Sequence, residues 1–261
     1  MEASFEIRNA TLGYGKKAVL QNVNLSLHTG QTICLIGRNG SGKTTLFKSL
    51  LGLLPPLGGD ILLNRKSIRS WERRHFARTV AYIPQARVLP FPLSVLEVVL
   101  FGRTAHLSPF LAPSKKDRII AEECLEKLHI THLKDRIFTQ LSGGEQQMVI
   151  VARALAQQPA FLIMDEPTAN LDFGNQIEII RQVNELRGEN MGIVMATHSP
   201  DHAFMCDADV AVLHRNCIRQ QGNCNDIITD SLLREIYGVN IAVLHAFKVK
   251  DGVQHQMNYE L

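Results

Sequence analysis

The sequence has no apolar run long enough to cross a membrane as a helix. A membrane-spanning helix needs about 20 consecutive apolar residues, but residues 88–101 are interrupted by Pro90, Pro92 and Glu97, and residues 46–57 by a lysine and two prolines. The opening residues, MEASFEIRNA, also lack the basic and apolar regions of a signal peptide. We therefore expect a cytoplasmic protein, and a role in transport would require a separate chain that spans the membrane.

Cysteine is scarce, and a strong excess of one charge is missing. The five cysteines, at 34, 124, 206, 217 and 224, include no C-x-x-C pair, which favours reduced, mostly buried thiols and no cysteine metal site. The 28 lysines and arginines nearly balance the 25 aspartates and glutamates, so the net charge is +3. The densest basic stretch, residues 65–74, contains only one aromatic residue and is interpreted as a solvated face. We therefore predict no nucleic-acid partner.

A glycine-rich segment, GRNGSGKTT at 37–45, follows the apolar run QTICLI and matches the pattern G-x-x-x-x-G-K-[ST]. A glycine turn between a buried strand and a helix points successive backbone N–H groups into one concavity, and the helix N-terminus adds a positive dipole. A chance glycine turn is the weaker interpretation, because strand, loop and helix occur in the required order. This segment therefore predicts a polyphosphate site.

An apolar run, FLIMDE at 161–166, ends in the two carboxylates of Asp165 and Glu166. A buried parallel strand delivers its last residues to the edge at which open α/β sheets bind their ligands. The alternative is a solvent-facing acidic pair, which poorly explains two like charges between an apolar strand and Pro167. We therefore expect both carboxylates to act at the nucleotide site.

A third segment, LSGGEQQ at 141–147, lies between these two in the sequence. Ser142 and Glu145 have the spacing of a capping box, so the start of a helix alone would explain both. The two glycines leave free N–H groups that a phosphate can approach closely. Together the three segments resemble the ATP-binding cassette of ABC transporters, and the resemblance extends over nearly the whole chain. It implies an ATPase that uses ATP and Mg²⁺.

The resemblance assigns roles to the residues of the first two motifs. Lys43 would contact the β- and γ-phosphates, and Thr44 would bind Mg²⁺. Asp165 would hold the Mg²⁺ shell, and Glu166 would polarise the attacking water. The nucleotide would bind along the whole loop, formed by Gly37, Arg38, Asn39, Gly40, Ser41, Gly42, Lys43, Thr44 and Thr45.

The resemblance also implies that two copies of the cassette form the sites together. Ser142, Gly143 and Gly144 would contact the γ-phosphate of ATP held by a second cassette. Residues 170–172 match the D-loop, which runs along that partner. The expected assembly is a homodimer.

Three single residues take their roles from their positions in the same resemblance. Gln85, after AYIP, matches the glutamine that contacts Mg²⁺ and the water and joins the helical lobe to the core. His198 matches the histidine that contacts the γ-phosphate, and Tyr14 matches the aromatic residue on which adenine stacks. Without the resemblance they would be interpreted as a surface glutamine, a satisfied strand-end histidine and a hairpin-turn tyrosine.

The order of the elements predicts an α/β fold, and the resemblance implies a RecA-like core that contains the phosphate-binding loop. Residues 4–27 alternate apolar and polar side chains, as in half-buried antiparallel strands. Beyond residue 160 strands and helices alternate, which indicates a parallel sheet with crossover helices. We expect one domain over 1–261, with an antiparallel β lobe, an inserted helical lobe at about 87–157 and a tail at about 239–261.

Two further segments, 91–106 and 232–239, resemble the importers of iron-siderophore, haem, cobalamin and, in some members, molybdate or tungstate. This resemblance implies a separate membrane permease, an indirect partnership with a substrate-binding protein, and a location at the cytoplasmic face of the membrane. An exporter cassette or a soluble non-transport ATPase remains an alternative. We expect Gln85 and exposed aliphatic side chains of 91–106 to dock the membrane partner.

Overall fold

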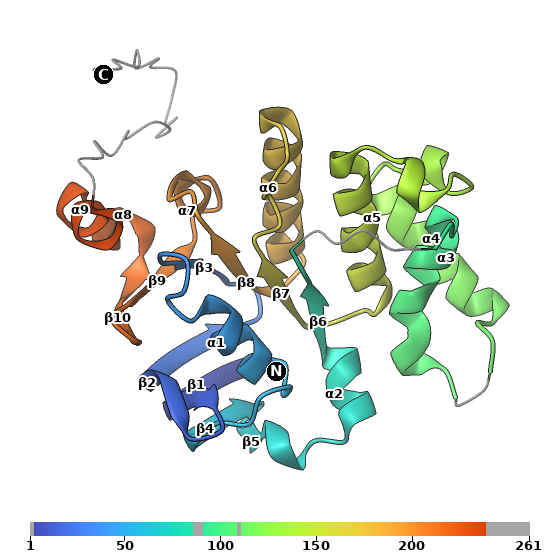
Figure 1. The fold of residues 1–261 in the computed structure, drawn as a ribbon. Helices are drawn as coiled ribbons and strands as arrows, with labels where there is room; N and C mark the ends of the chain where they lie inside the picture. The colour runs from blue at the N-terminus through green and yellow to red at the C-terminus, as the bar shows by residue number, and fades with distance from the viewer. Residues whose placement is uncertain (1–2, 86–90, 109–110, 239–261) are drawn as a thin grey trace.

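The computed structural model describes residues 3–85, 91–108 and 111–238, within which two β-sheets form the framework (Figure 1). The smaller sheet is antiparallel, as the alternation in residues 4–27 predicts. Its two long strands alternate buried and exposed side chains because one face packs on the core. In spatial order its strands are β2 (Lys17–His28), β1 (Ser4–Tyr14), β4 (Gly58–Leu63) and β5 (Lys66–Ser67).

The larger sheet is parallel except for one edge strand. In spatial order its strands are β10 (Cys217–Asn223), β9 (Asp209–His214), β3 (Thr32–Ile36), β8 (Gly192–Thr197), β7 (Phe161–Asp165) and β6 (Val80–Ile83). Only β10 runs antiparallel to its neighbour. Every residue of β3, β7 and β8 is buried because both faces of these strands are covered. The carboxyl ends of β3, β8, β7 and β6 therefore follow one another along one edge.

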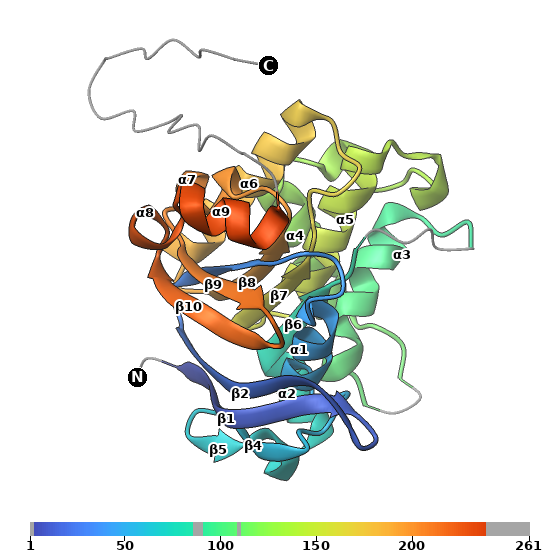
Figure 2. The same cartoon turned by 60° about the vertical axis from the view of Figure 1, so that its left-hand side comes forward.

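Helix α1 (Lys43–Leu50) lies between the two sheets, as Figure 2 shows. Its Leu46 and Phe47 belong to one apolar cluster with Phe5 of the small sheet and Phe161 of the large sheet. The rings of Phe5 and Phe161 meet edge to face with 5.6 Å between their centroids. A second apolar cluster covers the other face of the large sheet and continues into the helices beyond β6. Both faces of the sheet that carries the site are thus fixed by packing.

The segment between β6 and β7 contains helices and no strand of either sheet where it is described, as the sequence predicts. Its helices are grouped beside β6 in Figure 1: α3 (Val95–Leu100), η2 (Phe101–His106), α4 (Lys115–Lys127), η3 (Thr131–Leu133), η4 (Phe138–Gln140) and α5 (Gly143–Ala156). Each of the three α-helices begins with a serine capping box, at Ser94, Ser114 and Ser142. The capping box expected at Ser142 is therefore confirmed. Residues 86–90 and 109–110 of the predicted lobe lie outside the described residues.

The remaining helices are η1 (Ile68–Ser70), α2 (Arg73–Thr79), α6 (Phe173–Gly188), α7 (Asp201–Met205), α8 (Cys224–Ile227) and α9 (Asp230–Tyr237). Of these, η1 lies against β4 of the small sheet, and the others lie along the large sheet or at its ends. Four of the five cysteines are buried, as expected, and Cys217 is half-buried. Among the described helices, none combines the length and the apolar character that crossing a bilayer demands. The predicted tail at 239–261 lies outside the described residues.

The expectation that residues 91–106 expose aliphatic side chains is wrong. The apolar side chains of α3 at 95–99 are all buried, because this helix packs against α4 and α5. The large apolar side chains that this stretch does expose are the aromatic ones of Phe91 and Phe101. A docking surface in this part of the molecule must therefore be aromatic and polar rather than aliphatic.

Arg103, in the same stretch, is buried and makes polar contacts with several parts of the helical lobe. Its Nε donates to the Asp117 carboxylate at 2.9 Å, and its Nη1 donates to the carbonyl oxygen of Ala156 at 2.7 Å and to Gln158 Oε1 at 3.0 Å. Hydrogen bonds from Ser114 and from Arg103 hold the pKa of Asp117 at about 2. One guanidinium thus connects η2, the start of α4 and the end of α5.

We predict that Arg103→Leu lowers the free energy of unfolding by about 1.5–3 kcal/mol, because Asp117 loses its charged partner and keeps only its hydrogen bonds with Ser114. Since the pKa of Asp117 is depressed from 3.8 to about 2, the contribution of this carboxylate is full above pH 3.8 and is lost as the pH falls toward 2. Urea unfolding at pH 7 measures the change. The control is Arg118→Leu, whose ion pair with Glu122 is exposed and should contribute less than about 0.5 kcal/mol. Equal losses in both variants would contradict the prediction.

Candidate active site

Four loops of the predicted site meet at one edge of the large sheet. The glycine-rich loop follows β3, His198 follows β8, Glu166 follows β7, and Gln85 lies two residues beyond β6. The strands are neighbours in the order β3, β8, β7, β6 and run parallel, so these residues emerge side by side. Segments as far apart in the sequence as Gly37 and His198 are thereby brought to one place.

The glycine-rich loop follows a path that side chains would obstruct. Gly40 and Gly42 have φ angles of 79° and 105°, in the left-handed region that favours glycine. A Cβ atom at Gly37 would come within 2.7 Å of the carbonyl oxygen of Leu213 and of Ser41 Oγ. The backbone can therefore approach a ligand closely, and α1 begins directly after the loop.

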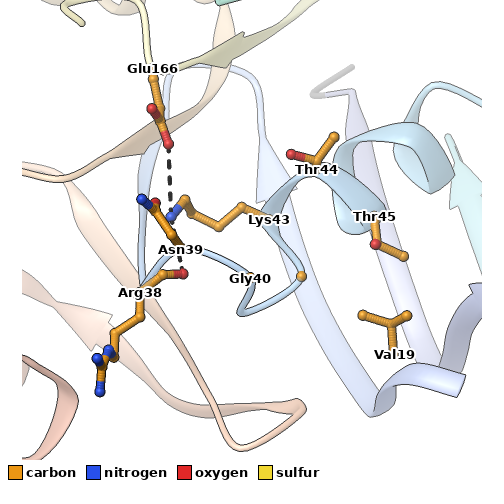
Figure 3. A pocket seen from close by; sticks show the side chains of 9 residues that line it. Val19, Arg38, Asn39, Gly40, Lys43, Thr44, Thr45 and Glu166 are labelled. Carbon is orange, nitrogen blue, oxygen red and sulfur yellow. Dashed lines mark hydrogen bonds and ion pairs between the residues drawn. The ribbon is translucent and has the colours of Figure 1, made fainter.

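Lys43, the first residue of α1, is buried with its side chain turned back over the loop. Its Nζ donates to the carbonyl oxygen of Gly37 at 2.7 Å and lies 3.8 Å from Glu166 Oε1 (Figure 3). Burial lowers the pKa of Lys43, and the charges of Glu166 and Asp165 oppose that effect. The ammonium thus bridges the phosphate-binding loop and the acidic end of β7.

Glu166 is the residue at which the four loops make contact. Its carboxylate lies 2.6 Å from His198 Nε2 and accepts a hydrogen bond from Gln85 Nε2 at 3.2 Å, in addition to the Lys43 contact. Its backbone is in the left-handed region with φ 51°, and its N–H donates to the carbonyl oxygen of Ala196 at 3.2 Å. The structure therefore brings together Lys43, Glu166, His198 and Gln85, which the sequence predicts to act together.

Asp165, the last residue of β7, is buried beside Glu166. Its Oδ2 accepts a hydrogen bond from the hydroxyl of Tyr82 on β6 at 3.3 Å. Burial, followed by the charge of Glu166, raises the pKa of Asp165. Sequence reasoning missed Tyr82, although its place in AYIP, three residues before Gln85, is a signal that it borders the site.

A cavity of roughly 190 Å³ opens over the loop. Its walls are Val19, Arg38, Asn39, Gly40, Gly42, Lys43, Thr44, Thr45 and Glu166, which Figure 3 shows around the start of α1. The Ser41 hydroxyl is buried and has no hydrogen-bond partner among the described residues. An unpartnered hydroxyl, glycine amides and a lysine fit the oxygens of a phosphate chain. The exposed Thr44 hydroxyl and the Asp165 carboxylate supply the hard oxygen ligands that suit Mg²⁺.

Tyr14 does not form part of the cavity wall. Its hydroxyl lies 3.5 Å from Lys48 Nζ, which also stands 5.6 Å from the centre of the ring. A hydrogen bond with Thr45, and next the contact with Lys48, lowers the pKa of Tyr14. The ring is nearly half exposed beside α1, and Val19, which sequence reasoning missed, lines the cavity from the same hairpin.

Ser142 and its glycines are held in a different place. The Ser142 Oγ accepts from the N–H of Glu145 at 3.3 Å, and the Glu145 carboxylate accepts from the N–H of Ser142 at 2.8 Å. A Cβ atom at Gly144 would meet the Asn175 side chain at 2.3 Å, so the start of α5 packs directly on the start of α6. None of residues 141–147 is among the residues that line the cavity. These residues therefore stand apart from the phosphate-binding loop of their own chain.

The chain resembles known proteins over most of its length. A family model described as ABC transporter matches residues 20–169. An uncharacterized ABC transporter ATP-binding protein of Haemophilus influenzae is 41% identical over 240 residues, which cover 92% of this chain and 91% of the relative. The hemin import ATP-binding protein HmuV of Bordetella pertussis is 35% identical over 250 residues, 92% of this chain and 94% of the relative. The inward-facing structure of a metal-chelate type ABC transporter has a TM-score of 0.81 at 30% identity, covering 91% of this chain and 90% of that chain.

We predict that Asp165→Asn stabilises the chain in buffer without nucleotide or Mg²⁺. The folded-state pKa of Asp165 is raised above its ordinary value of 3.8. Its ionisation therefore lowers the stability of the fold increasingly as the pH rises from 3.8 through the folded-state pKa, and asparagine removes the charge. The expected gain in unfolding free energy at pH 7 is about 0.5–2 kcal/mol, and it should shrink as acid protonates Asp165 in the parent chain. The control is Asp135→Asn, at an exposed position, which should change little. A loss of stability in Asp165→Asn would contradict the prediction.

Proposed function

The chain belongs to the ABC transporter ATP-binding family, and on that premise we propose that it is the ATP-hydrolysing motor subunit of a metal-chelate importer. Members of this family are ATPases coupled to transport. The cargo class is supported by the similarity to a hemin import protein and to a metal-chelate type transporter. Iron-siderophore, haem, cobalamin and the related molybdate or tungstate all fall within the proposal. One ATPase domain over 1–261 would serve this function, with about 87–157 as its helical lobe and about 239–261 as its tail.

The observation that carries the proposed mechanism is the set of contacts around Glu166. A carboxylate hydrogen-bonded to Gln85 and held by His198 and Lys43 is fixed at the edge of the phosphate site. We assign to Glu166 the role of the base that polarises the attacking water, which can contribute about 10²- to 10⁴-fold to the rate. Lys43 would bind the β- and γ-phosphates, and His198 would contact the γ-phosphate.

The proposed Mg²⁺ would be held by oxygen ligands around Lys43. Thr44, Asp165 and Gln85 are the assigned ligands, with phosphate oxygens and water completing the shell. When bound, the ion would neutralise the negative charge that develops on the phosphates. The raised pKa of Asp165 agrees with this role, because a cation beside it would favour the ionised carboxylate that burial and the charge of Glu166 disfavour.

A second copy of the chain is the proposed partner at the nucleotide. Ser142, Gly143 and Gly144 form a helix start whose N–H groups suit a phosphate, and they lie away from the cavity of their own chain. We assign them to the γ-phosphate of ATP bound by the other copy. Residues 170–172, directly before α6, would run along that copy.

A membrane permease is the proposed partner at the junction of the helical lobe and the core. A second cavity, of roughly 460 Å³, lies between α2 and η2, and its lining includes Arg73, Arg74, Phe101 and Gln157. An exposed aromatic ring flanked by two arginines suits a partner segment with apolar and acidic or carbonyl groups. The chain would then act at the cytoplasmic face of the membrane and receive its cargo indirectly from a substrate-binding protein.

We predict that Glu166→Gln slows steady-state ATP hydrolysis by at least about 10²-fold while ATP affinity stays within a few fold of the parent. The amide keeps the shape of the carboxylate but cannot polarise water as a base. Phosphate release measures turnover, and size-exclusion chromatography with ATP should reveal an accumulated dimer. The matched control is Glu126→Gln, an exposed glutamate on α4. Turnover within a few fold of the parent would remove Glu166 from the role of the base.

We predict that cysteines placed at Thr104 and Ser108 cross-link to the membrane subunit in the assembled transporter. Both side chains are exposed: Thr104 lines the second cavity, and Ser108 lies just after η2. Arg103 is buried and therefore unsuitable as a probe. A cysteine at Lys16, in the exposed β1–β2 turn, serves as the control that should not react. An active, assembled complex in which neither test position cross-links would locate the docking surface elsewhere.

A further inference from the structure

The turn that carries His198 is closed by a hydroxyl group inside the protein. Thr197, the last residue of β8, is 1% exposed, and its Oγ1 lies 2.7 Å from Nδ1 of His202. The same oxygen accepts a hydrogen bond from the N–H of Ser199 at 3.0 Å. One oxygen atom therefore connects both sides of the three-residue turn to a buried imidazole.

His202 is placed to accept a hydrogen bond from that hydroxyl. Its side chain is buried at the start of α7, and burial lowers the pKa of His202 while Asp201 opposes the effect, so the neutral ring is favoured. A neutral imidazole accepts a hydrogen bond at one of its ring nitrogens. The other available acceptor, the carbonyl oxygen of Ser199, is farther from the Thr197 hydroxyl, at 3.3 Å. The shorter contact therefore makes His202 the favoured partner.

His198 needs such support because little protein surrounds its side chain. The side chain is 45% exposed, and its Nε2 lies 2.6 Å from Oε1 of Glu166. The direction of an exposed ring depends mainly on the backbone that carries it. A small rotation of the turn would move Nε2 away from Glu166, and a displacement of about 1 Å at a reacting group can cost about 10²-fold in rate.

We propose that His202 is a positioning residue for ATP hydrolysis, which acts through the Thr197 hydroxyl to hold His198 against Glu166. The inference rests on the proposed roles of His198 and Glu166. His202 itself touches neither the nucleotide cavity nor Glu166 among the contacts of the described residues. Its contribution is to keep the turn in one conformation.

Steady-state hydrolysis by the purified full chain tests the proposal. His202→Leu removes the acceptor, and Thr197→Val removes the hydroxyl while keeping its shape. Each should lower kcat about 10- to 100-fold and change KM for ATP by less than about threefold. His202→Asn keeps an acceptor near the position of Nδ1, and Thr197→Ser keeps the hydroxyl, so both should recover most of the activity. Asp226→Asn, at an exposed position on α8, is the control and should remain within about twofold of the parent.

The decisive comparison uses a chain that already lacks the His198 ring. If His202 acts through His198, His202→Leu should change kcat by less than about twofold in the His198→Ala background. An undiminished loss in that background would overturn the proposal, because His202 would then act on another part of the fold. An impaired His198→Ala chain beside a fully active His202→Leu chain would overturn this inference alone. Full activity of His198→Ala would instead overturn the proposed role of His198 and, with it, the role of His202.

Thermal unfolding followed by circular dichroism verifies that the compared variants are folded. If His202→Leu is not folded, Thr197→Val provides the test.

Discussion

The site depends on the backbone turn at Glu166. The strand β7 ends at Asp165, yet the N–H of Glu166 still reaches the carbonyl oxygen of Ala196 on β8, so the ladder of the sheet continues one residue further. The left-handed φ of 51° then turns the side chain across the edge of the sheet. A non-glycine residue in such a conformation costs about 1–3 kcal/mol. Contacts of the Glu166 side chain with three other loops offset that cost. The strained turn is therefore stabilised by the site that it helps to form.

The sequence was sufficient to predict the architecture, and it also indicated that Lys43, Gln85, Glu166 and His198 come together, because the motifs sit at fixed places in the fold. The glycine-rich loop, FLIMDE and the histidine after GIVMAT each follow a buried strand, and parallel strands end at one edge. The prediction that failed was the exposure of aliphatic side chains in residues 91–106. The valines and leucines of this stretch look like a surface patch in a segment punctuated by prolines, but their environment depends on α4 and α5, which come later in the chain. Long-range packing of this kind leaves no local signal.

Individual partners were also beyond sequence reasoning. Tyr82 meets Asp165 only because β6 and β7 are neighbours, and Arg103 meets Asp117 only because η2 folds against α4. The same holds for Thr197 and His202, whose spacing of five residues gives no indication of a hydrogen bond until the turn and α7 are formed. Motifs therefore identify the groups that face the ligand more readily than the groups that hold them.

The close packing at Gly144 has a mechanical consequence. A Cβ atom at Gly144 would overlap Asn175, and Asn175 in turn donates to Asp172 through its backbone and its side chain, so direct contacts link the serine-glycine helix start to the turn before α6. Any force that a neighbouring molecule exerts at Ser142 would therefore be felt at residues 170–172, and through them at the loop that begins with Glu166.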